Sequence, residues 1–255
     1  GFPVFSLPAG DYAITVDAGD YLRGNDAYAF RLLDAAAFSP LTLNQQVSAN
    51  RSPANSTIGY RLAATAGTTL ILNSTDNGYY YAGSWRLIDP NGRNVAAVPS
   101  DGNGITYAIP VSGTYTLLNE GPYNTSGTAN VTFTLAQQTR AVSELTFNNP
   151  LSATLAGRQS LADYTFTLDT SGTVVFDNLD PVTANTNNLQ WQLAGPLGIV
   201  SGWRNVGSDD DAIYNLTAGR YTVTLRNTQD TAATYKFRLL DRNAATAITP
   251  GAEVH

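Results

Sequence analysis

The sequence predicts an all-β chain made of tandem, jelly-roll-like antiparallel β-sandwiches. Three observations lead to this prediction. The chain repeats itself after about a hundred residues, which is the length of a whole domain and not of a helical solenoid unit. Apolar residues alternate with Thr in short segments, as in half-buried strands. Gly-rich turn motifs separate these segments, and no segment shows a sustained helical stripe.

The repeat is clearest at a Gly-Xaa-Tyr motif that begins one predicted strand and is followed by a second recurrent strand. The three copies of this strand pair are 9–16 with 28–34, 112–118 with 131–135, and 218–225 with 235–241. Trp85 and Trp191 mark a further strand that occurs once in each full repeat. Three copies in the same phase indicate a duplicated domain.

These landmarks define the predicted domain organisation. It comprises the closing strands of a preceding repeat at 1–39, complete sandwiches at 40–142 and 143–246, and the first strand of a further repeat, or a tail, at 247–255. The segment 1–34 contains three predicted strands, around Val4, Tyr12 and Tyr28. Without opening strands their apolar faces would be uncovered. The cover would come either from the same chain upstream or from another molecule that exchanges strands with this one.

The strands of the first full repeat follow from alternation and from the turns between them. They are predicted at 41–43, around 60, at 67–72, 85–88, around 107, at 113–118 and at 131–135. In the segment Tyr115-Thr116-Leu117, a period of two places Tyr and Leu on one face and Thr on the other. Turns are predicted at 76–78, 89–92 and 101–104, where Asp, Asn, Pro and Gly cluster. The second full repeat has strand signals in the same order.

The order of these motifs resembles the bacterial pre-peptidase C-terminal domain. The resemblance rests on a strand at Tyr60, the segments 67–72 and 85–92, Tyr107, and the Gly-Thr-Tyr motif at 113–115. The second repeat departs from the pattern at 194–198, where Ala-Gly-Pro-Leu-Gly replaces Ile-Asp-Pro-Asn-Gly. The resemblance implies a small jelly-roll sandwich, an extracellular setting and an accessory, non-catalytic role, because this family occurs on secreted proteases and in large extracellular repeat proteins.

Composition excludes several classes of function. The 255 residues include no Cys, so no disulfide, thiol nucleophile or thiolate metal site is available. With 20 acidic and 14 basic residues, the net charge of −6 argues against nucleic acid and anionic membranes as partners. No apolar run approaches the ~20 residues of a membrane-spanning helix, so no membrane insertion is expected. A surface rich in Asn and Thr favours an extracellular or cell-surface location.

We expect no catalysis and therefore no enzyme activity. The one His is His255, the last residue, and a terminal residue cannot be held as the base of a catalytic triad. No pair of carboxylates recurs between the repeats. The predicted set of catalytic residues is therefore empty.

Aromatic residues supply the candidate binding sites. Trp85 and Trp191 occupy equivalent places, which favours a core position over a sugar-stacking platform. Tyr79, Tyr81 and Trp203 have no counterpart in the other repeat and lie near turns, where unit-specific function is expected. They are candidates for binding carbohydrate or a partner, and ordinary packing in a core or edge strand is the alternative.

The densest acidic cluster is Asp209-Asp210-Asp211. Carboxylate oxygens suit calcium, with Asp177 or Asp180 as further ligands, but the spacing matches no known calcium loop. A solvated turn is the simpler interpretation. We therefore expect no obligatory cofactor, with calcium as the alternative for this loop.

The sequence thus favours a non-catalytic structural or adhesive array of an extracellular bacterial surface protein. Its partners would be neighbouring repeats or copies of itself. Two alternatives remain. The chain could be an accessory module that binds polysaccharide or another substrate of a secreted enzyme, or a filament subunit that assembles by strand donation.

Overall fold

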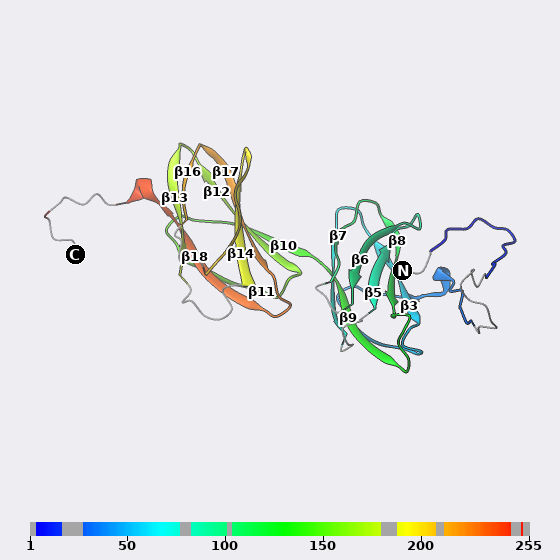
Figure 1. Ribbon diagram of the computed structural model, residues 1–255. Helices are drawn as coiled ribbons and strands as arrows, with labels where there is room; N and C mark the ends of the chain where they lie inside the picture. Colours follow the sequence, from blue (N-terminus) through cyan, green and yellow to red (C-terminus); the bar gives the residue numbers. More distant parts are fainter. Residues whose placement is uncertain are drawn as a thin grey trace, which may run out of the picture. The chain divides into compact units, whose positions relative to one another are not determined.

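The computed structural model describes residues 4–16, 28–76, 83–100, 104–179, 188–207, 212–245 and 251. The chain forms two compact units, unit 1 at 1–137 and unit 2 at 138–255 (Figure 1). The regular secondary structure of the described residues is β-strand apart from two short 3₁₀ turns, η1 (Ala35–Ala37) and η3 (Arg242–Ala244). The predicted all-β sandwich class is therefore confirmed. No helix among the described residues is long and apolar enough to cross a membrane.

Unit 1 is a sandwich of two sheets, with strand orders β1-β3-β8-β5-β6 and β2-β9-β4-β7. Its strands are β1 (Ser39–Pro40), β2 (Gln46–Arg51), β3 (Thr57–Ala64), β4 (Thr69–Asp76), β5 (Ser84–Ile88), β6 (Asn94–Pro99), β7 (Thr106–Ala108), β8 (Gly113–Glu120) and β9 (Ala129–Gln137). Both sheets contribute to one core, in which Trp85 of β5 packs against Phe133 of β9. The pairing is antiparallel except between β1 and β3.

Unit 2 repeats this topology strand for strand. Its sheets have the orders β10-β12-β17-β14-β15 and β11-β18-β13-β16. Its strands are β10 (Thr139–Glu144), β11 (Leu151–Leu155), β12 (Ser160–Leu168), β13 (Gly172–Asn178), β14 (Leu189–Gly195), β15 (Gly198–Asn205), β16 (Ala212–Leu216), β17 (Gly219–Asn227) and β18 (Ala233–Asp241). β10 pairs with β12 in parallel over six residues, whereas β1 pairs with β3 over two.

The repeated aromatic residues lie on corresponding strands. Tyr60 and Tyr164 lie on β3 and β12, Trp85 and Trp191 on β5 and β14, and Tyr115 and Tyr221 on β8 and β17. The Trp85 and Trp191 side chains are 0% and 2% exposed. The prediction that both are core residues is thus confirmed, and neither presents a ring to a ligand at the surface.

The Gly-Xaa-Tyr motif has a structural role in both units. A Cβ atom on Gly113 would lie 2.5 Å from Cγ of Pro90, and one on Gly219 would lie 2.5 Å from Cγ of Pro196. Gly219 also has a φ of +150°, which side chains of L-residues rarely adopt. Glycine therefore lets the strand entry approach the turn of the neighbouring hairpin.

The tyrosine of the motif makes the same hydrogen bond in all three copies, including the incomplete one. Its hydroxyl donates to the carbonyl oxygen four residues earlier. The bonds run from Tyr12 to Pro8 (2.6 Å), from Tyr115 to Val111 (3.0 Å) and from Tyr221 to Thr217 (2.9 Å). The bond closes a short corner that precedes the strand, as tyrosine corners do in other sandwiches.

The N-terminal segment does not form the three strands that its sequence predicts. Its described residues, 4–16 and 28–34, have no strand structure (Figure 1). Tyr12 and Phe30 are 55% and 57% exposed, whereas their counterparts Tyr221 and Phe237 are 3% and 0% exposed. The physical reason is the lack of partners: β17 pairs with β12 and β14, and β18 with β11 and β13.

The chain enters and leaves unit 2 at opposite ends of the sandwich. β10 begins at Thr139, beside Ser160 at the start of β12. β12 ends at Leu168, close in sequence to the start of β13, and Asp241 at the end of β18 pairs with Val174 of β13. β10 runs parallel to β12 and β18 runs antiparallel to β13, so both strands run from the end where the chain enters to the end where it leaves.

A buried tyrosine pair lies in the core of unit 2. The hydroxyls of Tyr164 and Tyr235 are 2.6 Å apart, and both side chains are buried. Burial raises the pKa of Tyr235 well above its ordinary value of 10.0, and the hydrogen bond with Tyr164 raises it further. The ionised phenolate is disfavoured because the site is largely shielded from water.

We expect this pair to make unit 2 sensitive to alkali. The folded state keeps the Tyr235 proton to a higher pH than the unfolded state does. The stabilisation is therefore complete below about pH 10 and decreases as pH rises above that value. Thermal unfolding between pH 8 and about 11.5 measures this effect. The Tyr235→Phe variant should lose less stability over the same range, and an equal loss in both proteins would contradict the prediction.

Candidate functional site

The outer face of the five-stranded sheet of unit 2 is the candidate site. On its central strand β17, Tyr221, Val223 and Leu225 are buried in the core. The alternate residues, Arg220 and Arg226 among them, are exposed or half-buried on the opposite face. Strands β12 and β14 flank β17, and β10 and β15 form the two edges of the sheet.

A β-bulge places Trp203 on this face. Trp191 of β14 pairs with Arg204 of β15, and Leu193 pairs with Ser201. Two residues of β15, Gly202 and Trp203, therefore lie opposite one residue of β14. A bulge changes the direction in which a side chain points. The Trp203 side chain remains 36% exposed, and its ring centroid is 3.9 Å from Cζ of Arg226.

Arg226 is held from two sides. Its Nε and Nη2 atoms both donate to Oε1 of Gln190, at 2.9 and 2.7 Å, and its guanidinium stacks on Trp203. Burial lowers the pKa of Arg226 from its ordinary value, although an arginine remains charged at neutral pH. In the part of the chain that the structure describes, no carboxylate forms an ion pair with Arg226.

Other charged side chains of this sheet lie on β10, β12 and β17. Arg140 of β10 forms an ion pair with Asp163 of β12 at 2.6 Å, and Thr224 donates to the same carboxylate at 2.7 Å. Arg220 donates to Thr165 at 3.2 Å. Glu144 is on β10, the edge strand farthest from Trp203. Among the described residues, the charged group in contact with the Trp203 ring is thus the guanidinium of Arg226, within a chain whose net charge is −6.

Unit 1 has a different arrangement at the corresponding position. Glu120 occupies the place of Arg226 and is buried, and its Oε1 atom lies 2.8 Å from Nη1 of Arg86. Ser84 donates a further hydrogen bond to Glu120 at 3.2 Å. The charge of Glu120 is thus neutralised by Arg86, whereas no carboxylate of the described residues pairs with Arg226.

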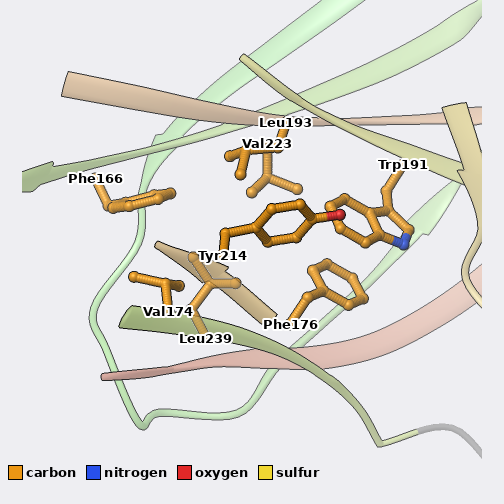
Figure 2. Close-up of a pocket in the computed structure, with 8 residues that line it drawn as sticks. All are labelled: Phe166, Val174, Phe176, Trp191, Leu193, Tyr214, Val223 and Leu239. Atoms are coloured by element: carbon orange, nitrogen blue, oxygen red, sulfur yellow. The ribbon is translucent and has the colours of Figure 1, made fainter. Parts of the chain in front are cut away.

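The core of unit 2 contains a cavity of about 10 Å³, which is roughly the space of one water molecule (Figure 2). It is lined by Phe166, Val174, Phe176, Trp191, Leu193, Tyr214, Val223 and Leu239. An organic ligand does not fit a cavity of this size. The atoms that form its surface are apolar, although the lining residues include Tyr214, whose Oη atom has no hydrogen-bond partner among the described residues. We therefore interpret the cavity as a packing gap.

The other predicted site residues are not brought together by the described structure. Tyr79 and Tyr81 lie outside the described residues, as do Asp180, Asp209, Asp210 and Asp211. Asp177 forms an ion pair with Arg238 at 2.6 Å. Within the described residues, no group of three or more His, Cys, Asp or Glu side chains is placed to hold a metal.

Sequence reasoning selected Trp203 but missed Arg226 and Gln190. A signal for Arg226 was present, because a cation stands where the other repeat has an anion, Glu120. The contact with Trp203 could not be foreseen, since it depends on a bulge that alternation alone does not reveal.

No family model and no curated protein sequence matches the chain. Several solved structures are similar to parts of it. PliG, a periplasmic inhibitor of g-type lysozyme from Aeromonas hydrophila, is 17% identical with a TM-score of 0.34 and covers 40% of this chain and 96% of its own. The pre-peptidase C-terminal domain of Bacillus anthracis collagenase is 14% identical with a TM-score of 0.30 and covers 40% and 95%. The CUB1-EGF-CUB2 domains of rat MASP-1 are 8% identical with a TM-score of 0.27 and cover 80% and 99%. These values do not assign the chain to a family.

Proposed function

We propose that the chain is a run of non-catalytic β-sandwich modules in a structural or adhesive region of an extracellular surface protein. The observation that supports this most is a third copy, at 9–16 and 28–34, of the sequence that forms a strand pair in each complete unit. It has the same tyrosine hydrogen bond as the two complete units. A tandem array of sandwich modules would account for a partial copy of the module beside two complete copies.

The residues that the two complete units share are those that maintain the fold. The residues common to both units are the turn glycines, the corner tyrosines and the core aromatics, and these determine packing and not chemistry. The abundance of Asn and Thr and the low charged fraction of 13% support an extracellular location. Together these features favour a mechanical or adhesive module over an enzyme.

The exposed apolar side chains of the N-terminal segment have counterparts in unit 2, and the strands that flank those counterparts indicate which strands would cover the segment. Tyr12, Ile14 and Val16 correspond to Tyr221, Val223 and Leu225 of β17, and 28–33 correspond to the end of β18. Strands equivalent to β12 and β14 would pair with the first row, and strands equivalent to β11 and β13 with the second. A preceding module of the same array would provide all four.

Deletion of residues 1–34 tests this proposal. We expect the 255-residue chain to self-associate and to bind a hydrophobic dye, because its apolar rows are uncovered. The shortened chain should be monomeric by light scattering and should unfold at an unchanged temperature, because the described residues of the deleted segment contribute to neither core.

Electron microscopy of the self-associated protein distinguishes two ways of covering residues 1–34, namely a preceding module of the same array and strand donation from another copy. Irregular oligomers are expected when a preceding module is the natural cover, whereas regular filaments that require residues 1–34 would establish strand donation between copies. A monomeric 255-residue chain whose residues 4–34 are protected from hydrogen exchange would contradict both.

A further inference from the structure

Arg226 is a half-buried cation without a carboxylate partner among the described residues, which is an uncommon arrangement. Its hydrogen bonds go to a neutral amide, and its other contact is the face of Trp203. Partial burial of a charge costs free energy unless the charge is paired. A neutral amide and an indole face compensate only part of this cost. The site would therefore gain stability from an anion supplied from outside.

Comparison of the two units shows that the fold does not require a charge without an ion-pair partner at the position of Arg226. At the corresponding position of unit 1, Glu120 is paired with Arg86 and buried. In unit 2 the place of Arg86 is taken by Gln192, which carries no charge. Unit 2 thus has a cation and an amide where unit 1 has a closed ion pair.

The residues around Arg226 form a surface that suits a sugar ring. Trp203 presents part of its ring at the edge strand β15, and the bulge that positions it lies opposite Gln192. Gln190 fixes the guanidinium through two hydrogen bonds, so its orientation does not change on binding. An aromatic face beside amide and guanidinium donors offers both stacking and hydrogen bonding.

We propose that the face around Trp203 and Arg226 binds a carboxylate-bearing polysaccharide, that is, a polymer of uronic acids. The apolar face of one sugar ring would pack on Trp203, and its carboxylate would meet Arg226. This binding site is independent of how residues 4–34 are covered.

Charge favours this ligand over other polyanions. Nucleic acids and anionic membranes bind through several cations at once. Here one cation lies next to the aromatic ring, and the whole chain has a net charge of −6. A uronate unit has one carboxylate and an apolar ring face, which matches one cation and one aromatic side chain.

The test is affinity electrophoresis of the 255-residue protein in gels that contain polygalacturonate or alginate. Retardation by at least one of the two polymers is expected. Fully methyl-esterified polygalacturonate has the same sugar chain without the charge, and retardation should be lost in it. The Arg226→Gln and Trp203→Ala variants should each bind about tenfold more weakly. Circular dichroism establishes that both variants are folded.

Controls separate this site from general charge effects. The Arg238→Gln variant removes an equal charge from the other sheet of unit 2 and should bind like the unaltered protein. Polyglutamate supplies carboxylates without a sugar ring and should cause no retardation. The proposal is overturned if neither polyuronate retards the protein, if the esterified polymer or polyglutamate binds equally well, or if the two site variants behave like the control.

Discussion

Replacement of Trp191 by alanine is expected to lower the free energy of unfolding of unit 2 by about 3–5 kcal/mol. The Trp191 ring stacks on Phe176 at a centroid distance of 4.1 Å and makes an edge contact with Tyr214 at 6.0 Å. It also lines the small core cavity (Figure 2). Removal of the indole would enlarge this cavity within an almost wholly apolar lining, where water gains few hydrogen bonds.

Trp203→Ala in the same unit is the matched control. Its side chain is partly exposed and contacts Arg226, so its loss should cost no more than about 1 kcal/mol. Denaturant unfolding followed by circular dichroism measures both changes. Equal losses in the two variants would mean that Trp191 does not have the core role that its burial indicates.

Replacement of Glu120 by alanine is expected to lower the free energy of unfolding of unit 1 by about 3–5 kcal/mol. The side chains of Arg86 and Glu120 are 11% and 4% exposed, and their charged atoms lie 2.8 Å apart. Without Glu120, the guanidinium of Arg86 loses its carboxylate while it stays buried. The hydrogen bond from Ser84 is lost as well.

A double variant, Arg86→Met with Glu120→Leu, distinguishes the pair from its parts. Replacement of both charges by apolar groups of similar size should cost much less than the single change, because no buried charge is left alone. Thermal and denaturant unfolding of unit 1 provide the comparison. A double variant as unstable as Glu120→Ala would show that the pair itself contributes net stability.

Strands β3, β4, β5, β7, β8 and β9 of unit 1 were predicted from alternation and turn motifs. Strands β2 and β6 were not, and the strand predicted at 41–43 was wrong, because the first strand of the second sheet begins only at Gln46. β10 was not predicted either. All six of its residues are exposed, so burial gives it no pattern. Its place depends on the free edge of β12, with which it pairs in parallel. A strand that is held only by backbone hydrogen bonds needs no particular pattern of apolar side chains, so its sequence does not reveal it.

The N-terminal segment is the opposite case, because it has the side-chain pattern of strands but forms none among its described residues. Residues 28–34 have almost the same sequence as 235–241, yet only the latter form a strand. Phe237 is covered because β11 and β13 flank β18. A strand is therefore a property of its neighbours as well as of its own residues, and sequence alone reveals only the capacity to form one.

The candidate site was predictable in part for a similar reason. Trp203 stood out because the other repeat has no aromatic residue in its place. Its face and its contact with Arg226 depend on the bulge in β15, which reverses the alternation expected of a regular strand. Side-chain direction at an irregular edge strand thus needed the backbone geometry.

The entry and exit of the chain at opposite ends of unit 2 determine how it responds to a pulling force. Tension along the polypeptide draws β10 and β18 lengthwise past their neighbours, so their hydrogen bonds, which run across the strands, are loaded together in shear and not broken one after another. β10 has six paired residues to resist this force, whereas β1 has two. Under load, the first strand of unit 1 is therefore the one that detaches at the lower force.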